Sequence, residues 1–304
     1  MWQALGLVDS GIGALPWHVS HAFLPTPYRL SDEEIRLYAA FLDGEKVGRI
    51  GYVDVSARDP RRVIRVSPSP VLDIGEAGCF DDHGVTPLTV TQVGDELRLY
   101  YTGWQLSTTI RYYLLTGLAI SRDRGESFTR ASQVPLLERS ESERTVRAAT
   151  HVMFHGGVWK MWYIAGSSTL MVNGKQLPTY DMRYLESSDG LSWGNRGRLV
   201  LSPDGRDEFG FGRPYVLETP DGFEMWYSIR THSQGYHLGY ATSPDGLNWR
   251  RQDAWAGAHP ARADWDSEMQ AYGAVVDCDH GRYLFYNGNN YGQAGFGVAR
   301  WEGE

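Results

Sequence analysis

The sequence contains very few cysteines and no long apolar run. Its two cysteines, Cys79 and Cys278, lie far apart without metal-binding or redox spacing, which argues against a disulfide scaffold or a cysteine zinc site. No apolar stretch approaches the roughly 18–20 residues that span a bilayer. Residues 1–11 lack the basic start and apolar core of a signal peptide. We therefore expect a cytoplasmic protein of a reducing compartment, with no membrane partner.

Positive charge is also in deficit. The chain has 29 Lys and Arg residues against 37 Asp and Glu residues, a formal charge of -8. A negative net charge does not attract phosphate groups. We therefore do not expect a surface that binds nucleic acid or an anionic membrane. Glycine and aromatic residues, in contrast, are abundant, with 35 Gly, 11 Trp and 18 Tyr among 304 residues. Many turns combined with many aromatics favour an all-β repeat protein, often one that handles sugars.

Two short patterns recur five times along the chain. The first is a Leu or Met followed by aromatic residues, at spacings of 59 to 64 residues. It occurs at Leu37-Tyr38, Leu99-Tyr100-Tyr101, Met161-Trp162-Tyr163, Met225-Trp226-Tyr227 and Leu284-Phe285-Tyr286. The second pattern follows each of these, at Gly51-Tyr52, Gly117-Leu118, Arg183-Tyr184, Gly239-Tyr240 and Gly295-Phe296. Such periods are close to those of propeller blades.

Each repeat is predicted to form four antiparallel strands. In the fourth repeat, the strands are expected at residues 213–218, 223–228, 237–243 and 249–251, with turn signals between them. The fifth repeat ends at Trp301 without a fourth strand, and residues 2–7 are expected to supply it and to close the ring. The prediction is an all-β five-bladed propeller that forms a single domain over residues 1–304.

Three turns carry a recurrent Ser-Asp-Gly signature. Residues 121–128 resemble the Asp-box turn of sialidases, and residues 187–193 and 243–249 are shorter relatives. We expect the aspartate to bond its own turn, the glycine to take a positive φ, and the aromatic residue to pack between blades. These acids are therefore predicted to be structural rather than catalytic.

The propeller geometry selects the candidate site. The inner strands begin around one axis, and the loops between second and third strands open on the same face. The candidate catalytic residues there are Asp82, Glu268, His83, His21 and Glu143. The candidate substrate-binding residues are Arg147, Arg213, Arg230, Gln270, Trp104, Tyr272, Asn287 and Asn289. Aromatic faces stack on sugar rings, and arginine offers a planar fork to a carboxylate or phosphate.

Each candidate also has a structural interpretation. Asp82 could cap its own turn, Glu268 could pair with an arginine, and Glu143 lies in a charged run typical of a solvated loop. The two inner arginines could be ion-pair partners, and the two candidate histidines could be acid/base groups or metal ligands. His151 is predicted to be a satisfied core histidine.

Several stretches resemble the five-bladed glycosidase superfamily of glycoside hydrolase families 43, 32, 68 and 130. The resemblance is greatest to a branch of predicted glycosidases found with polysaccharide-biosynthesis genes. The stretches are residues 80–87, 99–104, 117–121, 212–216, 225–228, 238–249 and 286–292.

The resemblance implies an acid in each of the first three blades. This chain matches it with Asp81 or Asp82 in the second, offers His21 in place of the first, and has Arg147 near the axis in the third, with Glu143 further out. A reorganised site would use Asp82 and Glu268, with His21 or His83 as proton carrier. The resemblance also implies a possible calcium ion in the central channel, although no cofactor is required.

Three functions follow from these residues. The first is a glycoside-active enzyme that hydrolyses or transfers a sugar, with an anionic sugar or glycoconjugate as its small-molecule substrate. The second is a non-hydrolytic reaction, such as cyclisation or elimination, on a biosynthetic intermediate. The third is a non-catalytic sugar-binding protein. The sequence predicts neither the sugar nor the oligomeric state.

Overall fold

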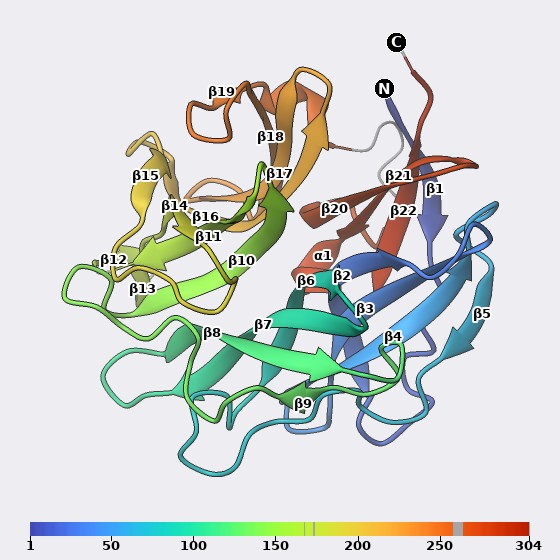
Figure 1. Cartoon of the computed structure of the whole chain (residues 1–304), viewed down its shortest axis with the longest axis horizontal. Helices are drawn as coiled ribbons and strands as arrows, with labels where there is room; N and C mark the ends of the chain where they lie inside the picture. Colours follow the sequence, from blue (N-terminus) through green and yellow to red (C-terminus); the bar gives the residue numbers. More distant parts are fainter. Residues whose placement is uncertain (167, 173, 258–263, 304) are drawn as a thin grey trace.

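The computed structural model describes residues 1–166, 168–172, 174–257 and 264–303. Almost all regular structure in these residues is β-strand (Figure 1). The helical turns are α1 (Asn289–Gly292) and the 3-10 turn η1 (Asp253–Trp255). The prediction of an all-β protein is therefore confirmed.

The strands form sheets that mostly follow chain order. One four-stranded sheet consists of β2 (Ser20–Arg29), β3 (Glu34–Leu42), β4 (Gly48–Ser56) and β5 (Val63–Val66). A second consists of β16 (Glu208–Thr219), β17 (Gly222–Thr231), β18 (His237–Ser243) and β19 (Arg250–Arg251). A third joins the N-terminal strand to the last three strands, in the order β1 (Trp2–Leu7), β22 (Phe296–Trp301), β21 (Gly281–Asn287) and β20 (Ala271–Cys278). The chain ends therefore lie together, with Trp2 opposite Trp301.

The remaining large sheet combines two repeats. The first contributes β6 (Val85–Val93), β7 (Glu96–Leu106), β8 (Tyr112–Ser121) and β9 (Thr129–Arg130), and the second contributes β10 (Val146–His155), β11 (Val158–Gly166), β14 (Asp181–Ser187) and β15 (Arg198–Leu201). A short parallel pairing between β8 and β10 joins the two halves. The hairpin of β12 (Thr169–Val172) and β13 (Lys175–Pro178), which the sequence analysis did not predict, is inserted between β11 and β14.

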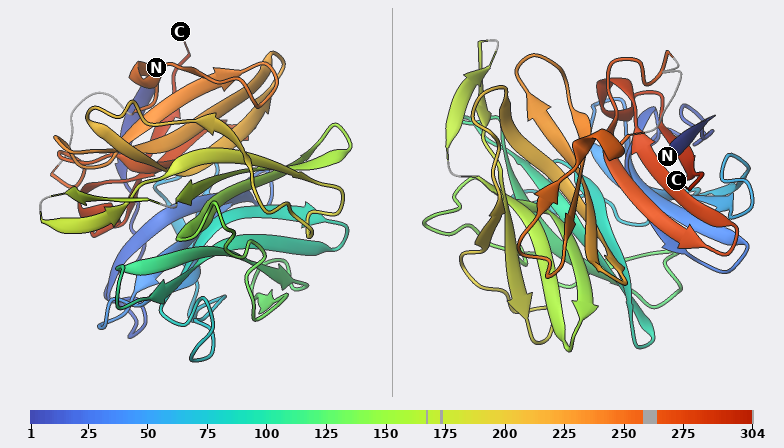
Figure 2. Two further views of the ribbon diagram at one scale, coloured as in Figure 1. Left: turned by 90° about the vertical axis from the view of Figure 1, so that its left-hand side faces the viewer. Right: turned by 90° about the horizontal axis from the view of Figure 1, so that it is seen from above.

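The first strand of each repeat lies toward the middle of the molecule in Figure 1, and Figure 2 shows the same sheets from two other sides. Strands β2, β6, β10, β16 and β20 each contact the next in chain order, and β20 contacts β2. All five have a shift of register against their neighbouring strand. In four of the five strands a non-glycine residue at such a shift has a positive φ: these residues are His21, Leu24, Ala149, Arg213 and Tyr272. Bulges of this kind re-aim side chains, and their strain requires support from the surroundings.

In the fourth repeat, the third strand has the predicted bounds, whereas the first strand is longer than predicted. Strand β16 starts at Glu208 rather than at residue 213, because the chain continues to pair with β17 across the bulge at Arg213. A strand pattern with a period of two is interrupted at such a bulge, so the sequence pattern misplaced the start.

Aromatic side chains connect the first three repeats each to a turn of the following repeat. A phenol or indole from the second strand of one repeat donates a hydrogen bond to the glycine carbonyl in the Ser-Asp-Gly turn of the following repeat. These bonds join Tyr38 to Gly125 (3.1 Å), Tyr100 to Gly190 (3.0 Å) and Trp162 to Gly246 (2.7 Å). We call them aromatic latches.

The turn aspartates have the predicted structural role. The Oδ1 atom of Asp245 accepts backbone N–H bonds from Leu247 and Asn248, both at 2.8 Å, while Gly246 has a φ of +74°. Asp189 accepts the equivalent bonds in its own turn.

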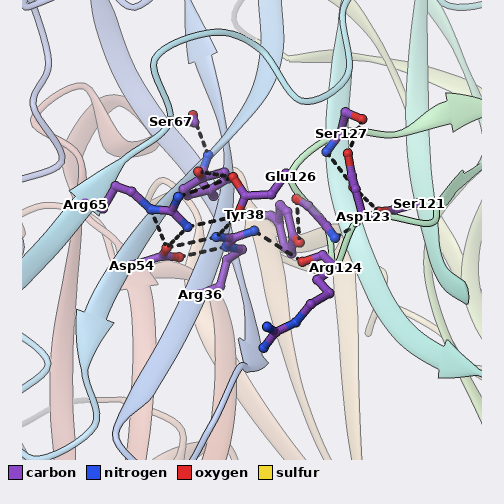
Figure 3. A network of polar contacts seen from close by, with 12 residues as sticks. Arg36, Tyr38, Asp54, Arg65, Ser67, Ser121, Asp123, Arg124, Glu126 and Ser127 are labelled. Atoms are coloured by element: carbon purple, nitrogen blue, oxygen red, sulfur yellow. Dashed lines mark hydrogen bonds and ion pairs between the residues drawn. The ribbon is translucent and has the colours of Figure 1, made fainter. Parts of the chain in front are cut away.

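A polar network with a buried centre and an exposed margin crosses from the first sheet to the turn after β8 (Figure 3). Arg36 forms a bidentate ion pair with Asp54, at 2.7 and 2.9 Å, and both side chains are buried. Glu126, in the turn, accepts further bonds from Arg36, Tyr52 and Arg65. Burial alone would raise the pKa of Glu126, but these three hydrogen bonds outweigh it and lower the pKa to about 2.

We predict that this network makes stability depend on acid pH. Because the folded-state pKa of Glu126 lies below its unfolded value of about 4.3, its stabilisation is complete above that value and is lost as the pH falls toward 2. In urea titrations, Glu126→Gln should be less stable than the wild type at pH 7, and the difference should shrink between pH 4.5 and 2. The exposed Glu45→Gln serves as the control. A constant difference for Glu126→Gln across this range would contradict the prediction.

A second prediction concerns the glycine of a latch turn. A Cβ at residue 246 would combine the positive φ with a contact 2.8 Å from Trp162, whereas Gly205 has a similar φ of +71° and nothing within 4 Å of its Cβ position. Gly205→Ala should cost about 1 kcal/mol and Gly246→Ala about 2–4 kcal/mol of unfolding free energy. Equal losses for the two variants in denaturant unfolding would show that latch packing adds nothing.

Candidate functional site

The predicted catalytic acid Glu143 is buried among fixed partners. It is 1% exposed, pairs with Arg147 Nε at 2.7 Å, and accepts a hydrogen bond from the Tyr163 hydroxyl at 2.8 Å. Its other oxygen accepts the backbone N–H of Gly197 at 3.2 Å. Burial, reinforced by the charge of Glu143, raises the pKa of the Tyr163 phenol. These contacts use both carboxylate oxygens within the protein.

The same acid–tyrosine contact occurs in other repeats. An acid that precedes the inner strand accepts a hydrogen bond from the tyrosine that ends the aromatic pattern on the second strand. The pairs are Asp81–Tyr101 (2.9 Å), Glu143–Tyr163 (2.8 Å) and Asp266–Tyr286 (3.0 Å). In the fourth repeat, Asp253, which follows the last strand, bonds Tyr227 at 2.7 Å. Acids before the inner strands are therefore part of the repeat architecture.

The other predicted catalytic residues lie on separate loops. Asp82 is half-buried and its Oδ2 atom accepts the Gly78 N–H at 2.9 Å, so it caps its own turn. His83 and Glu268 are exposed. Among the described residues, no hydrogen bond or ion pair joins Asp82 to Glu268.

The predicted amide ligands bond the backbone. Asn287 is fully buried and connects β21 to β2, through Leu24 N–H and Ala22 C=O. The Oδ1 atom of Asn289 accepts the backbone N–H groups of residues 268 and 269. Gln270 donates to Asp266 Oδ2 at 3.0 Å.

The inner arginines have different partners. Arg147 donates to the carbonyls of Glu138 (2.7 Å) and Gly194 (2.8 Å), in addition to its pair with Glu143. Arg213 instead donates to the inner strands of two other sheets, where its acceptors are Tyr272 O (2.6 Å), Pro25 O (2.7 Å) and Thr26 Oγ1 (2.8 Å). The structure thus separates two residues that the sequence placed in near register.

Arg213 makes no carboxylate contact among the described residues. Burial lowers its pKa to about 10, so the guanidinium remains charged at neutral pH. Burial lowers the pKa of His151 to about 3, and the charge of Arg213 contributes in the same direction. His151 is buried, as predicted, but its Nδ1 atom has no hydrogen-bond partner in the described part of the chain. The inner strands thus enclose a cation beside a neutral imidazole.

These residues do not fit a calcium ion beside Arg213. The carbonyls of Pro25 and Tyr272 already accept from the guanidinium, whose charge repels a second cation. Among the described residues, no three His, Cys, Asp or Glu side chains gather into a metal site.

A second buried arginine lies among aromatic rings. Arg230 is 4% exposed and donates to Pro178 O at 2.8 Å. Its guanidinium carbon lies 4.4 Å from the Tyr180 ring centre, 4.5 Å from Phe209 and 5.6 Å from Tyr236. In the described parts of the chain its contacts include no carboxylate, and its Nε has no hydrogen-bond partner.

Further tyrosines extend this group. The Tyr236 ring centre lies 5.7 Å from that of Tyr272 and 5.3 Å from that of Tyr291. Burial dominates the raised pKa of Tyr180, Tyr236 and Tyr272, and the charge of a neighbouring Tyr112 adds to it. We call these residues the arginine–tyrosine cluster: Arg230, Tyr112, Tyr180, Tyr236, Tyr272 and Tyr291.

The cluster is crowded but accessible. Tyr236 and Tyr272 are only half-buried and Tyr291 is 48% exposed, although burial raises the pKa of the first two phenols strongly. At neutral pH these phenols are neutral and able to donate hydrogen bonds. The predicted Trp104 adjoins them, with its ring 5.0 Å from that of Tyr112.

His21 adjoins the cluster through α1. Its φ is +59°, its Nδ1 lies 2.9 Å from Ser20 Oγ, and its ring also bonds the backbone of Asn290. Burial lowers the pKa of His21, with a smaller contribution from Lys46, so the ring is neutral at pH 7. Asn290 and Tyr291 both have left-handed φ values, of +51° and +61°.

The sequence analysis missed Phe209 and the tyrosines at positions 180, 236 and 291. A signal for two of them was present, since Tyr112, Tyr180 and Tyr236 each stand at or directly before the third strand of their repeat. No helix among the described residues has the length and apolar character to cross a membrane.

Comparisons with known proteins reveal close relatives of unassigned function and distant relatives of solved structure. No protein-family model matches the chain. The uncharacterized protein Rv1502 of Mycobacterium tuberculosis H37Rv is 34% identical over 298 residues, which is 98% of each chain. The uncharacterized protein MT1551 of M. tuberculosis CDC 1551 is 33% identical over the same share.

Among solved structures, the likeness is to glycoside hydrolases. A structure described as a glycoside hydrolase has a TM-score of 0.73 at 17% identity, covering 98% of this chain and 90% of its own. A thermostable family-43 glycoside hydrolase has a TM-score of 0.68 at 17% identity, covering 94% and 91%. A structure from the GH130 family of mannoside phosphorylases and hydrolases has a TM-score of 0.69 at 14% identity, covering 99% and 93%.

At such low identity these structures establish the fold alone, which is that of the propeller-type glycoside hydrolases. The mycobacterial relatives are similar enough over their full length to establish kinship. The chain belongs to the family of the uncharacterized M. tuberculosis proteins Rv1502 and MT1551.

Proposed function

We propose that the protein is a glycoside-active enzyme whose substrate, an anionic sugar or glycoconjugate, binds at the arginine–tyrosine cluster. The observation that carries this proposal is Arg230, a buried cation with no carboxylate among its contacts in the described residues. The fold likeness to glycoside hydrolases and phosphorylases supports the sugar as substrate class.

The chemistry of Arg230 favours an anionic ligand. A buried charge without a counterion is costly, and a carboxylate or phosphate removes that cost by forming charge-assisted bonds with the guanidinium fork. One N–H group of Arg230 donates to Pro178 O, and this bond fixes the plane of the guanidinium. The Nε atom of Arg230 has no partner among the described residues. Tyr236 and Tyr272 offer hydroxyl donors and ring faces for the sugar itself.

For the reaction, we keep Asp82 and Glu268 as the candidate carboxylates and His21 as the candidate proton carrier. Asp82 holds its turn through one oxygen only, and Glu268 is exposed, so both have an oxygen available to a substrate. His21 is neutral at pH 7 and able to accept a proton. Glu143 is the weaker candidate, because its oxygens are already bonded to Tyr163, Arg147 and Gly197.

A second function is favoured by one observation. No carboxylate in the described residues contacts the arginine–tyrosine cluster, whereas His21 reaches it through Asn290. A non-hydrolytic reaction on an anionic sugar, with His21 moving the proton, fits that arrangement without a carboxylate pair.

We also propose that the sheets are the blades of a five-bladed propeller that forms one domain over residues 1–304. The ordered contacts of the five inner strands and the pairing of β1 with β22 support this proposal.

We predict that Arg230 selects for anionic sugars. In isothermal titration with glucuronic acid, galacturonic acid, glucose 1-phosphate and glucose, the wild type should bind at least one acidic sugar more than tenfold tighter than glucose. Arg230→Gln should abolish this preference, and Arg230→Lys should weaken it at least tenfold because the fork is lost. The exposed Arg196→Gln should bind as the wild type does. Equal affinity for glucose and the acids would overturn the anionic-substrate proposal.

A separate prediction concerns the reaction. With a panel of 4-nitrophenyl glycosides and glycuronides in heavy-oxygen water, we expect one heavy oxygen in each hydrolysed product. Asp82→Asn and Glu268→Gln should each lower kcat at least about 100-fold, with substrate binding retained.

The other outcomes are equally informative. Turnover that survives both carboxylate variants, fails in His21→Asn and incorporates no heavy oxygen would replace hydrolysis by the non-hydrolytic reaction. Sugar binding without any product would contradict both reactions and would support a non-catalytic sugar-binding protein.

A further inference from the structure

One aromatic latch is incomplete. The position that Trp162 has in β11 is occupied by Trp226 in β17, and both residues stand between a methionine and a tyrosine in the repeated pattern. Trp162 donates to the Gly246 carbonyl at 2.7 Å. Trp226 is 2% exposed, and its Nε1 donor has no hydrogen-bond partner among the described residues.

The topology explains the missing acceptor. The sheet that follows β17–β18 consists of β20, β21, β22 and the N-terminal β1, so no Ser-Asp-Gly turn follows its third strand. In this region there is a cavity of about 230 Å³ between the two sheets. It is lined on one side by Trp226 and Tyr240, and on the other by Trp2 and Trp301.

The cavity is rich in fixed aromatic surfaces. Trp2 packs edge-on against Trp226 at 6.1 Å and against Trp301 at 5.2 Å. Trp255, from η1, also lines the cavity and is 50% exposed, so one large apolar ring faces solvent at its margin. Exposed tryptophan beside a polar cavity is a suitable surface for the apolar face of a sugar ring.

The polar lining has no net charge. Glu224 pairs with Arg282 at 2.5 Å and accepts the Tyr240 hydroxyl at 2.7 Å. Because the two charges compensate each other, the cavity does not attract an ion, but it presents acceptor and donor groups for hydroxyls. Gln252 adds an amide to this lining.

We propose that this cavity is a second carbohydrate site, which takes one uncharged saccharide ring. The ring would lie in the space between the two sheets, against the half-exposed Trp255, and its hydroxyls would bond Glu224, Arg282 and Gln252. The volume is below the roughly 300–1,000 Å³ of sites for drug-sized ligands, as a single monosaccharide unit requires.

This site is separate from the arginine–tyrosine cluster. Glu224 lies near the start of β17 and Arg230 near its end, so the two sites are at opposite ends of one strand, about 20 Å apart. The proposal does not depend on the proposed function, because it concerns different residues and a ligand of different charge.

Binding of methyl glycosides of glucose, mannose and galactose tests the proposal. We expect saturable binding of at least one of them below 50 mM, measured by calorimetry and by tryptophan fluorescence. Trp255→Ala should weaken this binding at least tenfold, because it removes the exposed ring against which the sugar would stack. Arg230→Gln should leave it unchanged, so failure here is distinguishable from failure of the anionic site.

Trp162→Phe is the matched control. It removes a latch bond that is satisfied, so it should lower Tm while leaving glycoside binding unchanged. Trp226→Phe removes a donor without a partner, so its Tm should fall less. The proposal is overturned if none of the three glycosides binds by 50 mM. It is also overturned if the chain forms a dimer that Trp255→Ala dissociates in sedimentation, because a second copy would then occupy the cavity.

Discussion

The aromatic latch is the contact on which the assembly of sheets depends. It demands two residues at once, an aromatic donor on one sheet and a glycine in the turn of the next. A Cβ on Gly125 would lie 1.9 Å from the Tyr38 hydroxyl, and one on Gly246 would lie 2.8 Å from Trp162. For the three latch pairs, the glycine and the aromatic residue therefore have one shared structural cause.

The acids and arginines of the inner strands have unequal roles. Asp81, Glu143 and Asp266 hold tyrosines of the second strands and are therefore committed to the scaffold. Arg213 and Arg230 are buried without carboxylate contacts in the described residues. A protein with net negative charge thus buries two positive charges, on β16 and β17, without carboxylate contacts among the described residues.

The repeat pattern predicted the strands and the turns because both follow from local spacing. It did not predict which face each inner residue occupies, since the bulges at Ala149, Arg213 and Tyr272 displace the register. The candidate Glu143 illustrates the difference, because its position along the chain was clear but its bonds to Tyr163 and Arg147 depend on tertiary packing. Tyr180 and Tyr236 were not predicted, because a single residue directly before a strand is not by itself a motif.

The pairing of β1 with β22 also has a consequence for biosynthesis. Trp2 and its partner Trp301 are far apart in the sequence, so β1 is synthesised long before the strand with which it pairs. At synthesis rates of about 5–20 residues per second, this separation corresponds to roughly 15–60 s. During that time the nascent chain carries an unpaired apolar strand, which is a hazard for aggregation. The sheet that contains β1 is therefore completed only after β22 has been synthesised.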